Sequence, residues 1–389
     1  MMKRNQIIWT IAILAIFAAG IGYYVTQQPF GEQSQSDSIR IGVILNLTGP
    51  LSTADVPKKL VLESSLDYLK ENTPEDDPIQ SVELLFEDGR TEPNAGISAY
   101  NKLYNEGVRF FLTGTSFNAM SLLPLVEEKD GLLMAVSGHP DFSGQNTIRL
   151  YPNVETGSSR MISILDSLGT QDIYILHTNE PFGRSYAEEV ENKFEGDVVG
   201  TEEFEISQLN FRNTISKIES ANPERIIVIG FGIAEQNLIK QLIESKIEIP
   251  ILGSEVFYYA FNNLQDDVDL SQYPGISETV FLAPKYIANL LSPEGNPFIR
   301  FYKNNHNGND PQIFGVFAAD GLSIIHAALQ EGSNITPQLV METIQNRDNI
   351  STFSGEVRIS PTGETEYPLI TLSFDQEGNI LFNSKNEGN

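Results

Sequence analysis

The chain has 389 residues, of which 40% are hydrophobic, and 25 basic against 52 acidic residues give it a formal net charge of -27. This length predicts about two globular units, and so negative a chain is repelled by nucleic-acid phosphates and anionic lipid, which excludes nucleic acid as a partner. The sequence contains no cysteine, which excludes disulfides, thiolate catalysis, cysteine-ligated zinc and a lipid anchor on cysteine.

The first residues have the pattern of an export signal. Lys3 and Arg4 precede an apolar run over residues 7–25. As a helix that run would measure roughly 28 Å, which is enough to cross a bilayer core as an uncleaved anchor. Ala18 and Gly20 are small residues where a signal peptidase reads the chain, so a cleaved signal peptide also fits.

The N-terminal pattern sets the compartment under either alternative. We expect residues 1–26 to be a signal peptide or a transmembrane anchor, and the polar residues 27–38 to be a flexible tether. The folded part is then exported, periplasmic or at the cell surface. We favour the anchor, in which case residues 7–25 tether the protein to the membrane.

From residue 39 onward, short apolar runs alternate with helical patterns, which predicts an α/β fold with parallel sheets. The strands predicted in the first series are 39–47, 82–87, 108–113 and 132–136, with helices at 57–72, 94–107 and 119–129. The second series has helices at 154–168, 183–194, 210–220 and 234–245, with strands at 172–177, 198–204, 225–230 and 249–252. Two α/β lobes account for this order.

The last third of the chain changes character. Helices are predicted at 297–305, 317–329 and 337–346. The alternating segments EVRIS and ITLSFDQEGN that follow are typical of a hairpin added to the edge of a sheet.

Several motifs in this order resemble the leucine/isoleucine/valine-binding class of ABC-transporter solute-binding proteins, over about residues 39–379. The motifs are IRIGVILNLTGPLS, FEDGRTEPNAGISAYNKLYNEGV, FLTGTSFNAMSLLPLVEEKDGLLMAVSG, IYILHTNEPFGRSYAEEVENKF, IPILGSEVF, VFAADGLSIIHAAL and FSGEVRISPTGE. The resemblance implies the type I periplasmic-binding-protein fold, with two doubly wound parallel-sheet lobes, three crossovers and a ligand cleft between them. Lobe 1 would comprise residues 39–151 plus 284–349, and lobe 2 residues 152–283 plus 350–385.

An amino-acid ligand needs donors for its carboxylate, an acid for its ammonium group and a lining wall. Thr115 and Ser116 lie between a strand and a helix N-terminus, which suits a carboxylate. Ser116 also falls where the resemblance implies a ligand-binding serine, although a serine before a helix is commonly only an N-cap. Ser137 and Gly138 follow the next strand, in a loop that the resemblance implies binds the ligand, but this loop looks shorter than the family pattern. His139 fits either the site or a surface loop.

Two further residues are implied by the resemblance. Glu255 occupies the place of the acid that pairs with the ligand's ammonium group, although a solvated loop glutamate is the ordinary alternative. Phe182 occupies the place of a tyrosine that covers the ligand, so a wall remains without the hydroxyl, and packing within its own lobe is equally open. We expect no cofactor, and the four histidines have no metal-site spacing.

Other classes of function have weaker support. Gly230-Phe231-Gly232 resembles part of a dinucleotide fingerprint but lacks its third glycine. Ser137, His139 and Asp141 lie too close together on one loop to form a hydrolase triad. The sequence therefore predicts no enzyme but a binding protein for a small polar ligand, an amino acid first, that delivers it to an ABC permease and its ATPases. The alternatives are a membrane-anchored sensor ectodomain that signals through a partner protein, and a binder of an amide or urea-type solute.

Overall fold

A computed structural model describes residues 38–262, 264, 268–287, 290, 296–332 and 334–382. The chain from Arg40 onward forms one compact unit, to which all further description applies. The predictions for residues 1–26 and nearly all of the tether lie outside the described residues. Within the described part of the chain, no helix has both the length and the apolar character that crossing a membrane requires.

The first sheet has five strands in the order β2-β1-β3-β4-β5. Its strands are β1 (Ile39–Leu45), β2 (Val82–Asp88), β3 (Phe110–Thr113), β4 (Leu132–Ala135) and β5 (Thr147–Arg149). The pairs β1–β3, β3–β4 and β4–β5 are parallel. Every residue of β3 and β4 is buried, as expected for central strands that helices cover on both faces.

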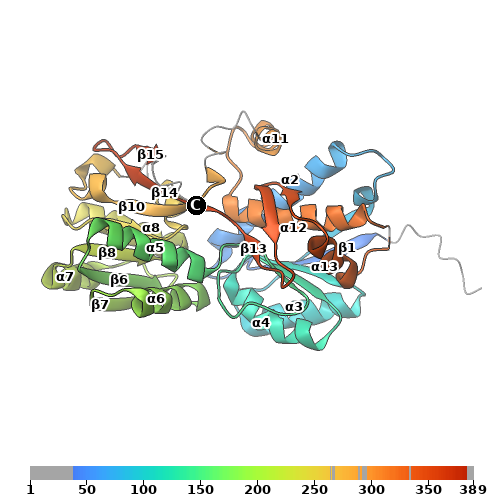
Figure 1. Cartoon of the computed structure of the whole chain (residues 1–389), viewed down its shortest axis with the longest axis horizontal. Helices are drawn as coiled ribbons and strands as arrows, with labels where there is room; N and C mark the ends of the chain where they lie inside the picture. The colour runs from blue at the N-terminus through green and yellow to red at the C-terminus, as the bar shows by residue number, and fades with distance from the viewer. Residues whose placement is uncertain are drawn as a thin grey trace, which may run out of the picture. The chain divides into compact units, whose positions relative to one another are not determined.

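Helices surround this first sheet, with α2 packed against α12 and α3 packed against α4 (Figure 1). The helices are α2 (Ser52–Glu71), α3 (Pro93–Asn105), α4 (Ser116–Glu128), α11 (Pro297–Asn305), α12 (Ile313–Leu329) and α13 (Pro337–Gln345), with a 3-10 turn η1 (Pro78–Ser81). α12 is buried along nearly its whole length, which makes it the central helix of this lobe.

The second sheet has seven strands in the order β15-β14-β10-β9-β8-β6-β7. They are β6 (Asp172–Thr178), β7 (Asp197–Phe204), β8 (Arg225–Ile229), β9 (Ile251–Gly253), β10 (Val280–Pro284), β14 (Leu369–Phe374) and β15 (Ile380–Phe382). The strands from β7 to β10 pair in parallel, and the β14–β15 hairpin adds an antiparallel edge. The surrounding helices are α5 (Val154–Leu168), α6 (Pro181–Lys193), α7 (Arg212–Ala221), α8 (Gly232–Glu244) and α9 (Phe257–Asn262), with 3-10 turns η2 (Leu270–Gln272) and η3 (Ile276–Glu278).

The two segments that the sequence suggested were one hairpin lie in different sheets, and the first of them, EVRIS, belongs to a small third sheet. This sheet consists of β11 (Ile350–Thr352), β12 (Gly355–Ile359) and β13 (Thr365–Glu366). β11 packs against α12, and Glu364 forms an ion pair with Arg149 at the end of β5. The lobe limits stay a prediction, and these contacts favour placing residues 350–366 with the first sheet rather than with lobe 2.

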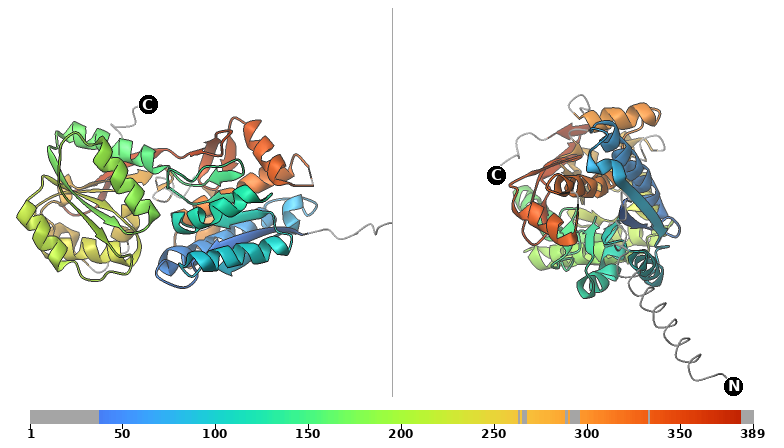
Figure 2. Two further views of the ribbon diagram at one scale, coloured as in Figure 1. Left: turned by 90° about the horizontal axis from the view of Figure 1, so that it is seen from below. Right: turned by 90° about the vertical axis from the view of Figure 1, so that its right-hand side faces the viewer.

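The chain passes between the two large sheets three times. The passages follow β5 at residues 150–153, follow β10 after Pro284, and join β13 to β14 at residues 367–368 (Figure 2). Tyr151 on the first passage and Tyr367 on the third both contact Phe317 of α12, with ring centroids 5.7 and 4.6 Å apart. The predicted α/β fold with two doubly wound lobes and three crossovers is confirmed.

The start of α2 differs from the prediction in a way that matters for the site. The sequence predicted a helix over residues 57–72. Instead the amides of Ala54 and Asp55 bond to the carbonyl of Leu51, so the first turn forms before the proline. The earlier start places Ala54, Asp55 and Lys58 on the N-terminal part of α2.

Candidate ligand-binding site

A pocket lies at the carboxyl ends of strands from both large sheets. Its lining includes Ser116 after β3, Gly138 after β4, Phe182 after β6 and Phe231 after β8. The pocket has an empty volume of about 440 Å³, part of which is open solvent. The loops at the carboxyl ends of parallel strands are where α/β sheets generally bind ligands.

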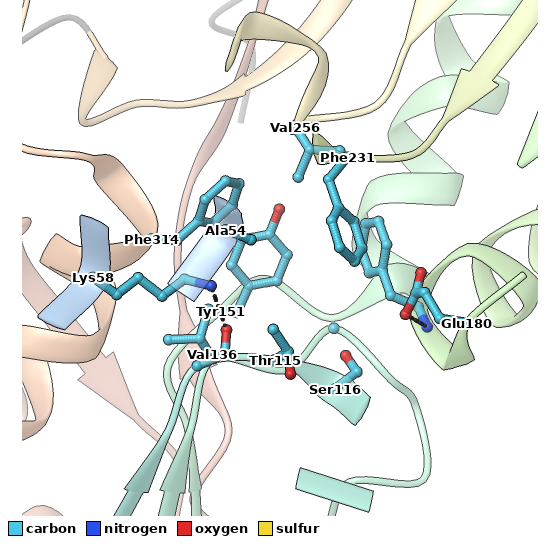
Figure 3. A pocket seen from close by; sticks show the side chains of 13 residues that line it. Ala54, Lys58, Thr115, Ser116, Val136, Tyr151, Glu180, Phe231, Val256 and Phe314 are labelled. Carbon is cyan, nitrogen blue, oxygen red and sulfur yellow. Dashed lines mark hydrogen bonds between the residues drawn. The ribbon is translucent and has the colours of Figure 1, made fainter. Parts of the chain in front are cut away.

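Thr115 and Ser116 form one end of the pocket, at the N-terminus of α4 (Figure 3). Thr115 is the N-cap, and its Oγ1 accepts the amide of Asn118 at 3.5 Å. Ser137 donates its hydroxyl hydrogen to Ser116 Oγ at 3.1 Å, so the hydroxyl hydrogen of Ser116 remains available to a ligand. The amides of a first helical turn have no intrahelical acceptor, so this end of the pocket favours an anion.

Lys58 lies beside that end and is the pocket's cation. Its side chain is buried, and its Nζ donates to Asp55 Oδ1 and to the carbonyl of Gly114, both at 2.7 Å. Its Nζ also lies 5.5 Å from the ring centroid of Phe314. An ammonium group has three donors, and no third acceptor for this one is found among the described residues.

Asp55 neutralises Lys58 and holds it in place. The carboxylate is fully buried, and its Oδ2 accepts the backbone amide and the side-chain amide of Asn46, each at 2.8 Å. Asn46 also donates to Thr115 Oγ1 at 3.3 Å. One network therefore connects α2, the end of β1 and the N-cap of α4, and it fixes the position of the lysine relative to the helix N-terminus.

Aromatic rings form most of the remaining wall. Phe182 contacts Tyr151 and Phe231, each with ring centroids 6.2 Å apart, and Phe314 contacts Tyr151 at 5.7 Å. Val256 adds an aliphatic contribution. In Figure 3 Tyr151 lies between Lys58 and Glu180, with Phe231 and Val256 above it. This wall suits the apolar body of a ligand rather than a second charged group.

Gly138 and Phe182 fit together so closely that only glycine is accommodated. A Cβ atom on Gly138 would lie 2.9 Å from Cδ2 and 3.0 Å from Cε2 of the Phe182 ring. Carbon atoms in contact are normally at least about 3.5 Å apart. The absence of a side chain at Gly138 is therefore what allows the loop after β4 to approach the start of α6.

Glu180 is a second charged group of the pocket, and it caps α6. Its carboxylate accepts the amides of Phe182 and Gly183, at 2.8 and 2.7 Å, and the hydroxyl of Thr178 at 2.9 Å. Burial raises the pKa of Glu180 to about 7, against the opposing effect of these hydrogen bonds. The carboxylate is thus engaged mainly with its own helix terminus.

Glu255 does not line the pocket. It is 1% exposed, and its two oxygens each accept a tyrosine hydroxyl at 3.0 Å, Oε1 from Tyr151 and Oε2 from Tyr186. Burial raises its pKa. Tyr151, which does line the pocket, therefore separates Glu255 from any ligand there. Glu235 on α8 is also buried, and burial together with the charge of Glu255 raises its pKa.

Arg149 organises the loop that carries Ser137, Gly138 and His139. Its guanidinium is buried and donates to the carbonyls of Ser137, His139 and Phe142, each at 2.7 Å. The ring of His139 turns back to its own loop, where Nδ1 accepts the amide of Asp141 at 3.2 Å, and burial lowers the pKa of the ring. His139 is not among the residues that line the pocket.

The structure thus brings together four of the seven predicted site residues, Thr115, Ser116, Gly138 and Phe182, as pocket lining. Ser137 does not line the pocket but bonds to Ser116, which does, and Glu255 bonds to Tyr151, which also lines it. Other residues that line the pocket were not predicted, among them Lys58, Tyr151, Glu180, Phe231, Val256 and Phe314. Glu180 had a sequence signal, because an acid before Pro181 is a typical helix start. Lys58 had none, since only the fold brings α2 next to β3.

Two α/β lobes, three connecting passages and one pocket at the strand ends define a two-lobed ligand-binding protein. Among the described residues, no group of three or more His, Asp or Glu side chains is arranged to hold a metal ion. The sequence profile of the periplasmic binding protein family matches residues 38–379, and the chain belongs to that family. This confirms the resemblance to the leucine/isoleucine/valine-binding class, and the family implies an extracytoplasmic location.

Known proteins agree with this assignment. The Leu/Ile/Val-binding protein homolog 3 of Brucella melitensis is 22% identical over 94% of this chain and 96% of its own length. The branched-chain amino acid transporter substrate-binding protein LivJ of Streptococcus pneumoniae, solved with isoleucine, has a TM-score of 0.73 at 13% identity, covering 88% of this chain and 97% of its own. A solute-binding protein of an ABC transporter from Rhodopseudomonas palustris BisB5, solved with 3,4-dihydroxy benzoic acid, has a TM-score of 0.74 at 15% identity, covering 89% and 96%.

Proposed function

We propose that this chain is an extracytoplasmic solute-binding protein that captures a small carboxylic acid in the pocket and delivers it to an ABC permease, without catalysing a reaction. The observation that carries the proposal is that Ser116, at a helix N-terminus, and the buried cation Lys58 both line a pocket whose remaining wall is mainly aromatic and aliphatic. A carboxylate bound there would receive charge-assisted hydrogen bonds.

The relatives make amino acids and aromatic acids the two candidate ligand classes. One structural relative was solved with isoleucine and another with 3,4-dihydroxy benzoic acid, and both ligands carry a carboxylate. An amide or urea-type solute has no carboxylate and would leave the donors at Ser116 and Lys58 without an anionic acceptor. We therefore place that alternative behind the acids.

The lobes would close on the ligand by bending at the three passages, and the closed form would be presented to the membrane partner. A sensor ectodomain would use the same closure, but its partner would transmit a signal rather than the solute. Transport and sensing differ in the partner and not in the pocket.

Thermal melting tests ligand capture, because a ligand that binds only the folded state raises the midpoint. The full-length protein would be melted with a panel of amino acids, aromatic and aliphatic acids, and amides. We expect acids to raise the midpoint and Ser116→Ala to reduce that rise. Ser121→Ala is the matched control, because Ser121 lies on the same helix and donates to the carbonyl of Phe117. A panel without any stabilising acid would contradict the proposal.

A further inference from the structure

The hydrogen-bonding groups around the pocket are unbalanced in favour of donors. Lys58 has used two of its three donors, and the hydroxyl hydrogen of Ser116 is free because Ser116 accepts from Ser137. The amides of Ser116 and Phe117, the first two residues of α4, have no acceptor within the helix. A bound carboxylate would satisfy all of these groups at one end of the pocket.

The carboxylates near the pocket, Asp55 and Glu180, each accept three hydrogen bonds from protein groups. Asp55 accepts two hydrogen bonds from Asn46 and one from Lys58. Glu180 accepts three hydrogen bonds at the start of α6, and Figure 3 shows it on the far side of Tyr151 from Lys58. Neither of the two is arranged to receive an ammonium group next to a carboxylate held at Ser116.

Glu255 is the acid that the family resemblance implies for the ammonium group of an amino-acid ligand, but it does not line the pocket. Tyr151 and Tyr186 each donate a hydroxyl to one of its oxygens, and only 1% of the residue is exposed. To reach Glu255, an ammonium group would have to displace the Tyr151 hydroxyl. Without that displacement it would be buried against the rings of Phe182, Phe231 and Phe314, and the acid that lines the pocket, Glu180, already accepts three hydrogen bonds at its own helix terminus. Burial of an ammonium group there is therefore unfavourable.

We propose that the ligand is a small monocarboxylic acid with an aliphatic or aromatic body and no α-ammonium group. Its carboxylate binds Ser116 and Lys58, and its body lies against the aromatic wall. This inference rests on the proposed function and narrows its ligand class. The buried ion pair of Lys58 with Asp55 supplies a directed donor with little net charge, which suits one carboxylate rather than two.

Calorimetric titration of the full-length protein at neutral pH tests the inference with pairs of ligands that differ only in the ammonium group. The pairs are hydrocinnamate with phenylalanine, isocaproate with leucine, and isovalerate with valine. For at least one pair, we expect the acid without the ammonium group to bind at least about tenfold more tightly than its amino-acid counterpart. The Glu255→Gln variant should bind that acid with unchanged affinity, because Glu255 does not contact the ligand.

The outcomes separate the inference from the proposed function. Tighter binding of the amino acid in every pair that binds, lost in Glu255→Gln or Glu180→Gln, would overturn the inference and leave solute capture intact. Equal affinity within the pairs would overturn it as well, since the ammonium group would then carry no cost. Binding of neither class, by a protein that melts cooperatively, would overturn the inference together with the proposed function.

Discussion

Tyr151 donates its hydroxyl hydrogen to Glu255 Oε1 at 3.0 Å, and Tyr186 donates to Oε2 of the same carboxylate at the same distance. The two tyrosines are equivalent toward Glu255 but not toward the pocket, because only Tyr151 lines it. Removing either hydroxyl leaves one oxygen of a buried acid without its donor, which should lower the free energy of unfolding by about 1–3 kcal/mol.

The matched pair Tyr151→Phe and Tyr186→Phe therefore separates stability from binding. We expect similar losses of stability in denaturant melts of the two variants. Only Tyr151→Phe should change ligand affinity, since Tyr151 lines the pocket and its loss of the hydroxyl frees the Glu255 oxygen on that side. Equal effects of the two variants on affinity would show that Tyr151 does not separate Glu255 from the ligand.

Gly138→Ala tests the close fit between the loop after β4 and α6. The new Cβ would lie 2.9 Å from the Phe182 ring, so either the ring or the loop must move. We expect ligand affinity to fall by at least about tenfold, which corresponds to about 1.4 kcal/mol. Gly332→Ala is the control, because a Cβ there would meet nothing within 4 Å. Unchanged affinity in Gly138→Ala, measured by calorimetry, would argue against this contact in the ligand-bound state.

Lys58 and Asp55 can be tested as a pair. Lys58→Met leaves the fully buried Asp55 without its cation, which should cost about 3–5 kcal/mol of folding free energy. Adding Asp55→Asn removes the stranded charge and should restore most of that stability in urea melts. Ligand binding should stay lost in the double variant, because the carboxylate's donor is gone. If the double variant binds acids as tightly as the unaltered protein does, Lys58 does not contact the ligand's carboxylate.

The buried acids predict the direction of the pH dependence of stability. Burial raises the pKa of Glu180 and of Asp320 to about 7, above the ordinary values of 4.5 and 3.8. The folded state therefore holds more protons than the unfolded state between those values and about pH 7, and stability falls as the pH rises through that interval.

Substituting one of these acids should weaken the pH dependence. In Glu180→Gln, the decline in melting midpoint between about pH 5 and pH 8 should be smaller than in the unaltered protein, because one ionisation is removed. Glu188→Gln is the control, since Glu188 is exposed on the same helix. If the two variants show the same pH profile, Glu180 does not titrate in this range.

The sequence was sufficient for those parts of the structure that depend on local pattern and element order. The central strands β3 and β4 are mainly apolar runs, and the β/α alternation predicted two α/β lobes correctly, while the family resemblance implied their doubly wound topology. The predicted place of Thr115 and Ser116, between a strand and a helix N-terminus, is also confirmed, and their role in binding stays a prediction. Strand β5 was missed because it has only three residues, Thr147–Arg149, and strand β10 was missed as well.

The rest of the site depends on tertiary contacts that the sequence does not display. Lys58 was missed because only the fold brings α2 next to the end of β3, where the carbonyl of Gly114 accepts a hydrogen bond from its Nζ. Glu255 was predicted as a ligand contact because the family resemblance implied an acid at its place in the loop. Only the fold shows that Tyr151, distant in sequence, lies between it and the pocket.

A crystal structure of the protein with the tightest-binding acid of the panel tests the central claim most directly. The account predicts that the lobes enclose the ligand, with its carboxylate within hydrogen-bond distance of Ser116 and Lys58 Nζ and its body against Phe182 and Phe231. A carboxylate bound elsewhere, or a ligand outside this pocket, would contradict it.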